Sequence, residues 1–153
     1  MKGRHLLAAT VTGSLSSLIL LARHGEPFRS TGPLVVGEFP GEVRPSADPR
    51  TDERAYWVHN TGVRDVQIRE VASGARDEVR EASVGSRRAR PATGSTWSRG
   101  DLLGAAAQPA QGALLPPGSE RMLFVRVTGG GDPASPLVAL TYQYRGQVFT
   151  AHA

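Results

Sequence analysis

The side chains that most often carry out chemistry in proteins are sparse in this 153-residue chain, and their spacing does not match a familiar site. The chain has no cysteine, which excludes a thiolate nucleophile, a thiolate zinc site and a disulfide framework. No two of its histidines have the spacing of metal ligands, and a zinc site needs several convergent groups. The histidines are His5, His24, His59 and His152.

Patterns built on a serine nucleophile, a carboxylate pair or a phosphate loop are also missing from the sequence. The serines lack a Gly-x-Ser-x-Gly elbow, and the acidic residues are scattered beside arginines. The run Gly129-Gly130-Gly131 lacks the lysine and the helix start of a phosphate-binding loop, which favours a flexible hairpin connection. We therefore predict a non-catalytic protein with no cofactor.

The basic residues give the chain a net charge of +4, and only Lys2 among them is a lysine. This preference for arginine is typical of a GC-rich bacterial genome, such as an actinobacterial one. Most arginines alternate with acidic residues, and the one unmixed cluster is Arg87-Arg88-Ala89-Arg90. Because a nucleic-acid site needs a contiguous basic face, the pattern favours solvated loop charge and no nucleic-acid partner.

The two tryptophans are the candidate contacts for a protein partner. Trp57 alternates with Tyr56 and Val58, and only one of these two sets can point into a core. Trp97 lies in a stretch rich in Gly and Ser, where it either closes the core or presents an exposed ring. The sequence leaves both alternatives open for each tryptophan.

The elements that must position these residues begin after a hydrophobic leader at residues 1–25, which reads as a signal anchor or a signal peptide. Lys2 and Arg4 precede an uncharged stretch at residues 6–22, which would span roughly 25 Å as a helix. Leu20 is a poor −3 residue for cleavage, so an uncleaved anchor is favoured over a cleaved peptide and over a buried core helix. We expect the cytoplasmic membrane with the C-terminal domain outside, or secretion if the leader is cleaved.

Strand patterns recur between turn-forming residues in the rest of the chain. Residues 26–54 read as a spacer with a short first strand, and residues 55–153 as a β-sandwich domain. Strands are expected at residues 34–39, 55–59, 63–71, 120–128, 137–144 and 147–152. Residues 72–118 give a weaker signal, in which strands at 79–84 and 113–115 compete with helical turns at 76–82 and 101–107.

The last two expected strands define their own register. A two-residue loop at Arg145-Gly146 would form a hairpin with three same-face pairs. These pairs are Tyr144 with Gln147, Tyr142 with Phe149, and Leu140 with Ala151. A slip by one residue would expose Phe149, so the hydrophobic pattern supports this register.

The strand spacing predicts an all-β fold, an immunoglobulin-like antiparallel β-sandwich preceded by an N-terminal hydrophobic helix. The runs Tyr56 to Ile68 and Leu115 to Val127 contain a strand–Asn-x-Gly–strand element and a Pro-Pro-Gly–strand element. In both respects the chain resembles bacterial exported Ig-like domains. The resemblance implies a non-catalytic interaction or structural module, anchored in the membrane or exported, with an unidentified protein partner.

The same strand order is similar to that of periplasmic copper chaperones of the PCuAC type, which bind Cu(I) through paired His and Met ligands. Met122 lies near the position of that family's His-x-Met run, but the matching histidine is absent here. The alternative function is therefore a degenerate copper carrier, with Met122 and His59 as the remaining candidate metal ligands. Packing is the favoured role for Met122.

Overall fold

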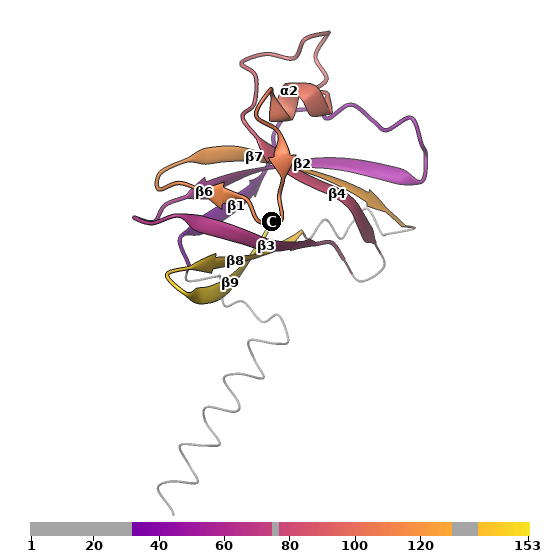
Figure 1. Cartoon of the computed structure of the whole chain (residues 1–153). Coiled ribbons are helices and arrows are strands. Elements are labelled where there is room, and N and C mark those ends of the chain that lie inside the picture. Colours follow the sequence, from indigo (N-terminus) through magenta and orange to yellow (C-terminus); the bar gives the residue numbers. More distant parts are fainter. Residues whose placement is uncertain (1–31, 75–76, 130–137) are drawn as a thin grey trace, which may run out of the picture.

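A computed structural model describes residues 32–74, 77–129 and 138–153, which form two antiparallel sheets packed face to face (Figure 1). The predicted leader lies outside the described residues, as does most of the Gly129–Gly131 connection. In the part of the chain that the structure describes, we find no helix that could span a membrane. The prediction of an all-β sandwich is confirmed.

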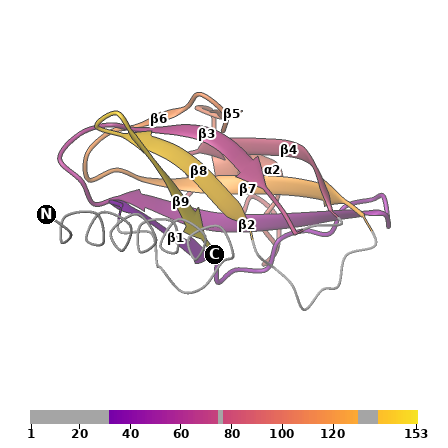
Figure 2. The same cartoon turned by 90° about the horizontal axis from the view of Figure 1, so that it is seen from below.

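The first sheet has five strands in the order β1-β2-β7-β4-β5, and the second has four in the order β6-β3-β8-β9. The first comprises β1 Leu34–Glu38, β2 Thr51–Asn60, β7 Glu120–Thr128, β4 Glu78–Gly85 and β5 Gln108–Pro109. The second comprises β6 Leu114–Leu115, β3 Val66–Ala72, β8 Ala139–Tyr144 and β9 Gln147–His152. A short helix, α2 Arg99–Leu103, follows β4. Figure 2 shows the two sheets as layers, with β9 beside the edge strand β1.

The main core lies between the sheets and is built from alternate side chains of each strand. Leu123, Val125 and Val127 of β7 share the inward face, as the sequence predicts. Val66 and Ile68 of β3 meet them from the second sheet, and both are fully buried. Each such aliphatic side chain contributes about 1.5–3 kcal/mol through burial, so this alternation is the main source of stability.

The β8–β9 hairpin has the predicted register, with Tyr142 opposite Phe149 and Leu140 opposite Ala151. Arg145 and Gly146 both have positive φ, at 50° and 78°, which is the geometry that a tight two-residue turn requires. The rings of Tyr142 and Phe149 are stacked, with centroids 5.6 Å apart. The stacked aromatic pair therefore ties the register of the hairpin to its packing on the core.

The weakly patterned middle of the chain contains both expected strands, at β4 and β6, together with the short β5. Residues 78–82 lie in β4, so the strand alternative holds there and the helical turn does not. The expected helical turn at residues 101–107 is present as α2, which begins and ends earlier. β2 begins at Thr51, and all of β1 pairs with it, so residues 34–38 and 51–54 of the expected spacer belong to the first sheet.

Candidate interaction surface

The first sheet has a second apolar layer on its outer face, the face that points away from the second sheet. We call it the outer cluster; its buried members are Ala55, Leu102, Leu103, Met122 and Phe124. Four half-buried side chains pack against them, namely Phe39, Val43, Trp57 and Trp97. α2 supplies the two leucines and docks on β7 and β4, so β7 is covered on both faces there. This double burial explains the unbroken apolar run from Met122 to Val125.

A capping box holds α2 in place. Asp101 N donates to Ser98 Oγ at 3.2 Å, and Ser98 N donates back to the Asp101 carboxylate at 3.0 Å. The same carboxylate accepts from Ser98 Oγ at 2.8 Å and from Ala92 N at 3.1 Å. The backbone and side-chain bonds from Ser98 hold the pKa of Asp101 below its ordinary value. The Ser98–Asp101 pair, of which the carboxylate is buried, therefore forms a helix start.

Three loop segments are joined by main-chain bonds around α2. Trp97 N donates to Glu42 O and Arg44 N donates to Trp97 O, each at 2.8 Å. Arg88 N donates to Asp101 O at 2.8 Å, and Ser86 N donates to Leu103 O at 3.0 Å. The loop after β4, the segment after β1 and α2 thus form one connected cover over the outer face.

The structure brings both predicted partner-contact tryptophans to this outer face, and each remains half-exposed. Tyr56 and Val58 take the inward positions of β2, so Trp57 points outward, where its indole lies against Gly37 of β1. A Cβ at Gly37 would overlap that ring. Each tryptophan therefore packs against the outer cluster and also remains partly accessible. The two roles that the sequence left open, packing and an exposed ring, are both present.

Trp97 belongs to a stack of aromatic and cationic groups. Its ring meets the edge of Phe39 with centroids 5.3 Å apart at 84°. The Arg87 guanidinium lies 5.0 Å from the Trp97 ring centroid and 5.8 Å from that of Phe39. Such cation–π contacts orient the guanidinium while leaving its charge in solvent. No sequence pattern predicts this stack, because Phe39, Arg87 and Trp97 are far apart in the chain.

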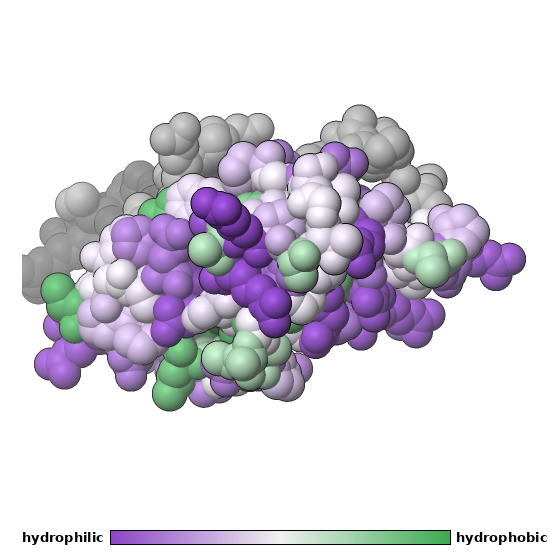
Figure 3. Space-filling model, turned by 90° about the horizontal axis from the view of Figure 1, so that it is seen from above, coloured by the Kyte–Doolittle hydropathy of each residue, from purple (hydrophilic) through white to green (hydrophobic). Residues whose placement is uncertain are grey.

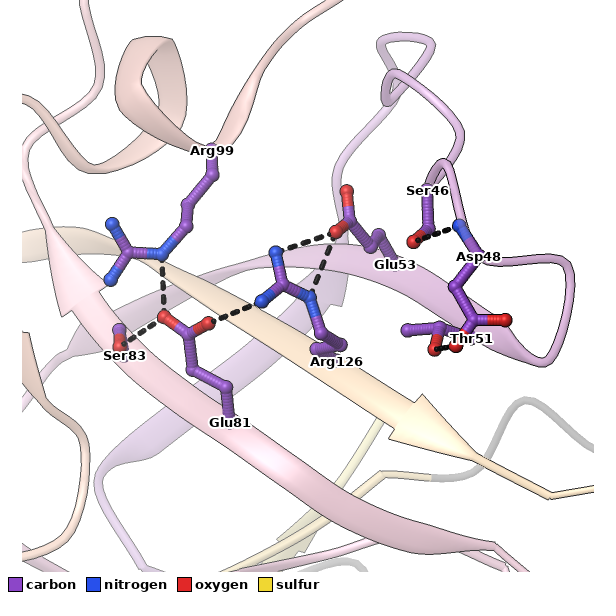
Figure 4. Close-up of polar contacts among 8 residues, drawn as sticks. All are labelled: Ser46, Asp48, Thr51, Glu53, Glu81, Ser83, Arg99 and Arg126. Atoms are coloured by element: carbon purple, nitrogen blue, oxygen red, sulfur yellow. Dashed lines mark hydrogen bonds and ion pairs between the residues drawn. The ribbon is translucent and has the colours of Figure 1, made fainter.

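A chain of ion pairs crosses the same face beside the outer cluster (Figure 4). Arg99 contacts Glu81 at 2.5 Å, Glu81 contacts Arg126 at 3.1 Å, and Arg126 contacts Glu53 at 2.7 Å. The guanidinium carbons of Arg99 and Arg126 also lie 6.0 Å and 5.7 Å from the Phe124 ring centroid. These carboxylates are consequently engaged with arginines of neighbouring elements. Figure 3 shows mainly hydrophilic side chains on the side of the molecule that carries α2.

The two candidate metal ligands of the copper alternative lie on this face without forming a ligand pair. Met122 is 4% exposed and lies opposite Trp57, enclosed by the outer cluster. His59 is half-exposed, two positions along β2, and lies opposite Glu120. Within the described residues, no group of three or more His, Cys, Asp or Glu side chains could hold a metal ion. The enclosure of Met122 agrees with its predicted packing role.

Two shallow hollows lie at the end of the sandwich where β2 turns into β3. One, of about 650 Å³, is lined by Val63, Arg64, Asp65, Pro117 and Arg145. The other, of about 390 Å³, is lined by Gly32, Pro33, Tyr144, Arg145, Gln147 and Phe149. Asp65 is the single acidic side chain among these linings, so neither hollow gathers an acid–base pair.

The outer face is thus the part of the described molecule where the candidate contact residues converge. In the sequence, the feature that indicates coverage of β7 on both faces is the unbroken apolar run at residues 122–125. No protein-family model matches the chain, and no curated protein is significantly similar to it in sequence.

Proposed function

We propose that this chain is a non-catalytic interaction module, an Ig-like sandwich that residues 6–22 hold at the outer face of the cytoplasmic membrane. It is secreted instead if the leader is cleaved. The observation that carries the proposal is that two tryptophans and three arginines converge on one outer face. They are Trp57, Trp97, Arg87, Arg99 and Arg126. Aromatic and arginine side chains are the groups most enriched at the centres of protein interfaces.

The order of the strands supports the Ig-like part of the proposal. The run β1-β2-β7-β4 corresponds to the A-B-E-D sheet of a constant-type immunoglobulin domain. The run β3-β8-β9 corresponds to its C-F-G sheet, and the two-residue strands β5 and β6 are additions at the edges. Domains of this architecture serve mainly as recognition or structural modules, which is an analogy at the level of the fold.

The chemistry of the polar groups on the outer face is consistent with a binding role. Asp101 is committed to the helix cap, and Glu53 and Glu81 are committed to ion pairs with arginines. The half-buried rings of Trp57 and Trp97 keep exposed edges on a rigid support. A partner would bury these edges without a large loss of conformational entropy.

Labelling of unique cysteines tests the topology, because the chain has no cysteine of its own. Val148, which is 66% exposed on β9, and Gly3, which precedes the hydrophobic segment, are each changed to cysteine in separate full-length variants. A membrane-impermeant maleimide should label Val148→Cys on intact cells and Gly3→Cys only after lysis. Labelling of Val148→Cys only after lysis would contradict the proposal.

Site-specific photo-crosslinking tests the interaction role. A photoreactive residue at Arg90, exposed in the loop after β4, should give one discrete adduct in intact cells, and the same residue at exposed Thr150 of β9 should not. Adding Trp97→Ala should abolish the Arg90 adduct in chains that circular dichroism shows to be folded. Equal adducts at both positions, or none at either, would count against a binding role for this face.

A further inference from the structure

The loop that follows β4 carries three exposed arginines, and of these only Arg88 has a charged neighbour in the described part of the chain, the Asp101 carboxylate, whose pKa it helps to lower. Arg87, Arg88 and Arg90 make no ion pair with any described residue. Arg44, also exposed, lies nearby because its main chain bonds to Trp97. Four other arginines do pair with acidic side chains, namely Arg54, Arg80, Arg99 and Arg126. We call residues 86–90 together with Arg44 the arginine loop.

The arginine loop is held in shape by its contacts with α2. Ser86 N and Arg88 N donate to the carbonyls of Leu103 and Asp101, and Arg87 is stacked over Trp97. Asp101 also accepts from Ala92 N, which fixes the other end of the same loop. A partner that binds these arginines therefore orders little additional backbone, and preorganisation of this kind strengthens binding.

The arginine loop also lies on the side of the molecule opposite the point where the described chain begins. Gly32 packs against Tyr142 and Phe149 of the second sheet, so a Cβ there would lie 2.9 Å from Phe149 Cγ. The arginine loop lies with α2 on the outer face of the first sheet. If the leader is the membrane anchor, as in the proposed function on which this inference rests, the loop points away from the tether and is accessible.

From this geometry we infer that the arginine loop binds a segment of a partner protein rich in aspartate and glutamate. A guanidinium group matches a carboxylate with two parallel hydrogen bonds, and a planar side chain fixed by stacking is already oriented for it. Several guanidinium groups within four residues match carboxylates that are similarly close together. The interaction gives the proposed module a partner of defined chemistry.

Nucleic acid is a poorer match for the same surface. Single strands bind by stacking bases on free aromatic rings, whereas Trp97 and Phe39 are packed against each other and covered by Arg87. An extended phosphate backbone would also pass the ion-pair chain, where Glu53 and Glu81 carry negative charge.

Fluorescence anisotropy with a fluorescein-labelled decaglutamate peptide tests the inference, with the full-length chain held in an uncharged detergent. We expect saturable binding that weakens as salt is added. Arg87→Gln, Arg88→Gln and Arg90→Gln in one variant should weaken binding about tenfold. Arg50→Gln, Arg64→Gln and Arg145→Gln remove the same charge from exposed positions elsewhere and should change affinity by less than about twofold.

Three results would overturn the inference. One is an equal loss of peptide affinity in the two triple variants, which would mean that binding depends on net charge alone. Another is tighter binding of oligothymidine, or of vesicles rich in phosphatidylglycerol, through the same three arginines. The third is no binding of the peptide at low salt by a chain whose circular dichroism shows it to be folded. In that case a discrete adduct at Arg90 would still support the proposed function, so the two failures are distinguishable.

Discussion

The side-chain amide of Asn60, at the end of β2, donates a 2.8 Å hydrogen bond to the carbonyl of Leu115 in β6, which belongs to the other sheet. The same amide donates to Arg64 O at 2.8 Å, and its oxygen accepts from Gly62 N at 2.9 Å. The main chain of Asn60 bonds to Ser119 O and receives a bond from Gly118 N. One fully buried side chain thus joins the Asn-Thr-Gly turn to the Pro-Pro-Gly turn.

Replacement of Asn60 by alanine should destabilise the protein strongly. The change leaves the buried carbonyl of Leu115, the partly buried carbonyl of Arg64 and the amide of Gly62 without their side-chain partner, which together should cost about 2–4 kcal/mol of unfolding free energy. Urea unfolding followed by circular dichroism measures the loss. Thr150→Ala, at an exposed position on β9, is the control and should change stability by less than about 0.5 kcal/mol. A similar small change for Asn60→Ala would show that the turns hold each other without it.

The contrast between the β8–β9 hairpin and Asn60 shows what the sequence could predict. The hairpin register follows from alternation and a tight turn, because all of its pairing partners lie within fourteen residues of one another. Both turns joined by Asn60 were also expected, since Gly and Pro define them locally. The contact between these two turns was not expected, because 55 positions separate Asn60 from Leu115 and no periodic pattern spans that interval.

The outer cluster illustrates the same limit at the candidate site. Trp57 and Trp97 could be singled out as amphipathic aromatics, but their shared face depends on where α2 docks. That docking is set by Leu102 and Leu103 packing on Met122 and Phe124, which are contacts between distant parts of the chain. The arginine cluster was visible in the sequence, whereas its support by Trp97 and Asp101 required the fold.

A methyl group at Gly37 should disturb Trp57 selectively. Because a Cβ there would overlap the indole, Gly37→Ala must displace the ring from the β1 surface. We expect a loss of about 1–3 kcal/mol in unfolding free energy, as for overpacked sites, together with a red shift of tryptophan fluorescence. Gly100→Ala, where the nearest atom to a Cβ would be Ser98 Oγ at 3.8 Å, is the matched control and should leave the emission maximum unchanged. An unshifted spectrum for Gly37→Ala would contradict the placement of Trp57.

The capping carboxylate should give the domain an acid-sensitive component of stability. The pKa of Asp101 is lowered from 3.8 by its bonds with Ser98. A carboxyl group whose folded pKa is depressed stabilises the protein above its unfolded pKa, and this contribution is lost as the pH falls through the folded pKa. The difference in unfolding free energy between wild type and Asp101→Asn should therefore be largest at neutral pH and shrink below about pH 4. A constant difference for Asp101→Asn across this pH range would refute the assignment.

The ion-pair chain should contribute little despite its extent. Arg126 lies between Glu53 and Glu81, but the side chains of Arg126 and Arg99 are 37% and 42% exposed, so solvent screens their attraction. Glu81→Gln should cost about 0.5–1 kcal/mol at low salt and less at high salt. Glu78→Gln, which removes a more exposed pair with Arg80, should cost almost nothing. A salt-independent loss for Glu81→Gln would indicate that its bond from Ser83 matters more than its charge.

Substitutions of Met122 test most directly whether this residue packs or binds copper. Its side chain fills space among Ala55, Leu102, Leu103 and Phe124, so Met122→Ala should cost about 2–4 kcal/mol through the cavity it leaves. Met122→Leu keeps nearly the same volume and should cost less than about 1.5 kcal/mol. Neither alanine nor leucine has a sulfur atom, so a copper carrier would lose its metal in both variants. If Met122 only packs, Met122→Leu should keep nearly all of the stability and Met122→Ala should not. We expect anaerobic titration of the full chain with Cu(I) against a competing chelator to give no stoichiometric complex. A tight complex that both Met122→Leu and His59→Ala abolish, in chains that remain folded, would make copper the ligand of this outer face.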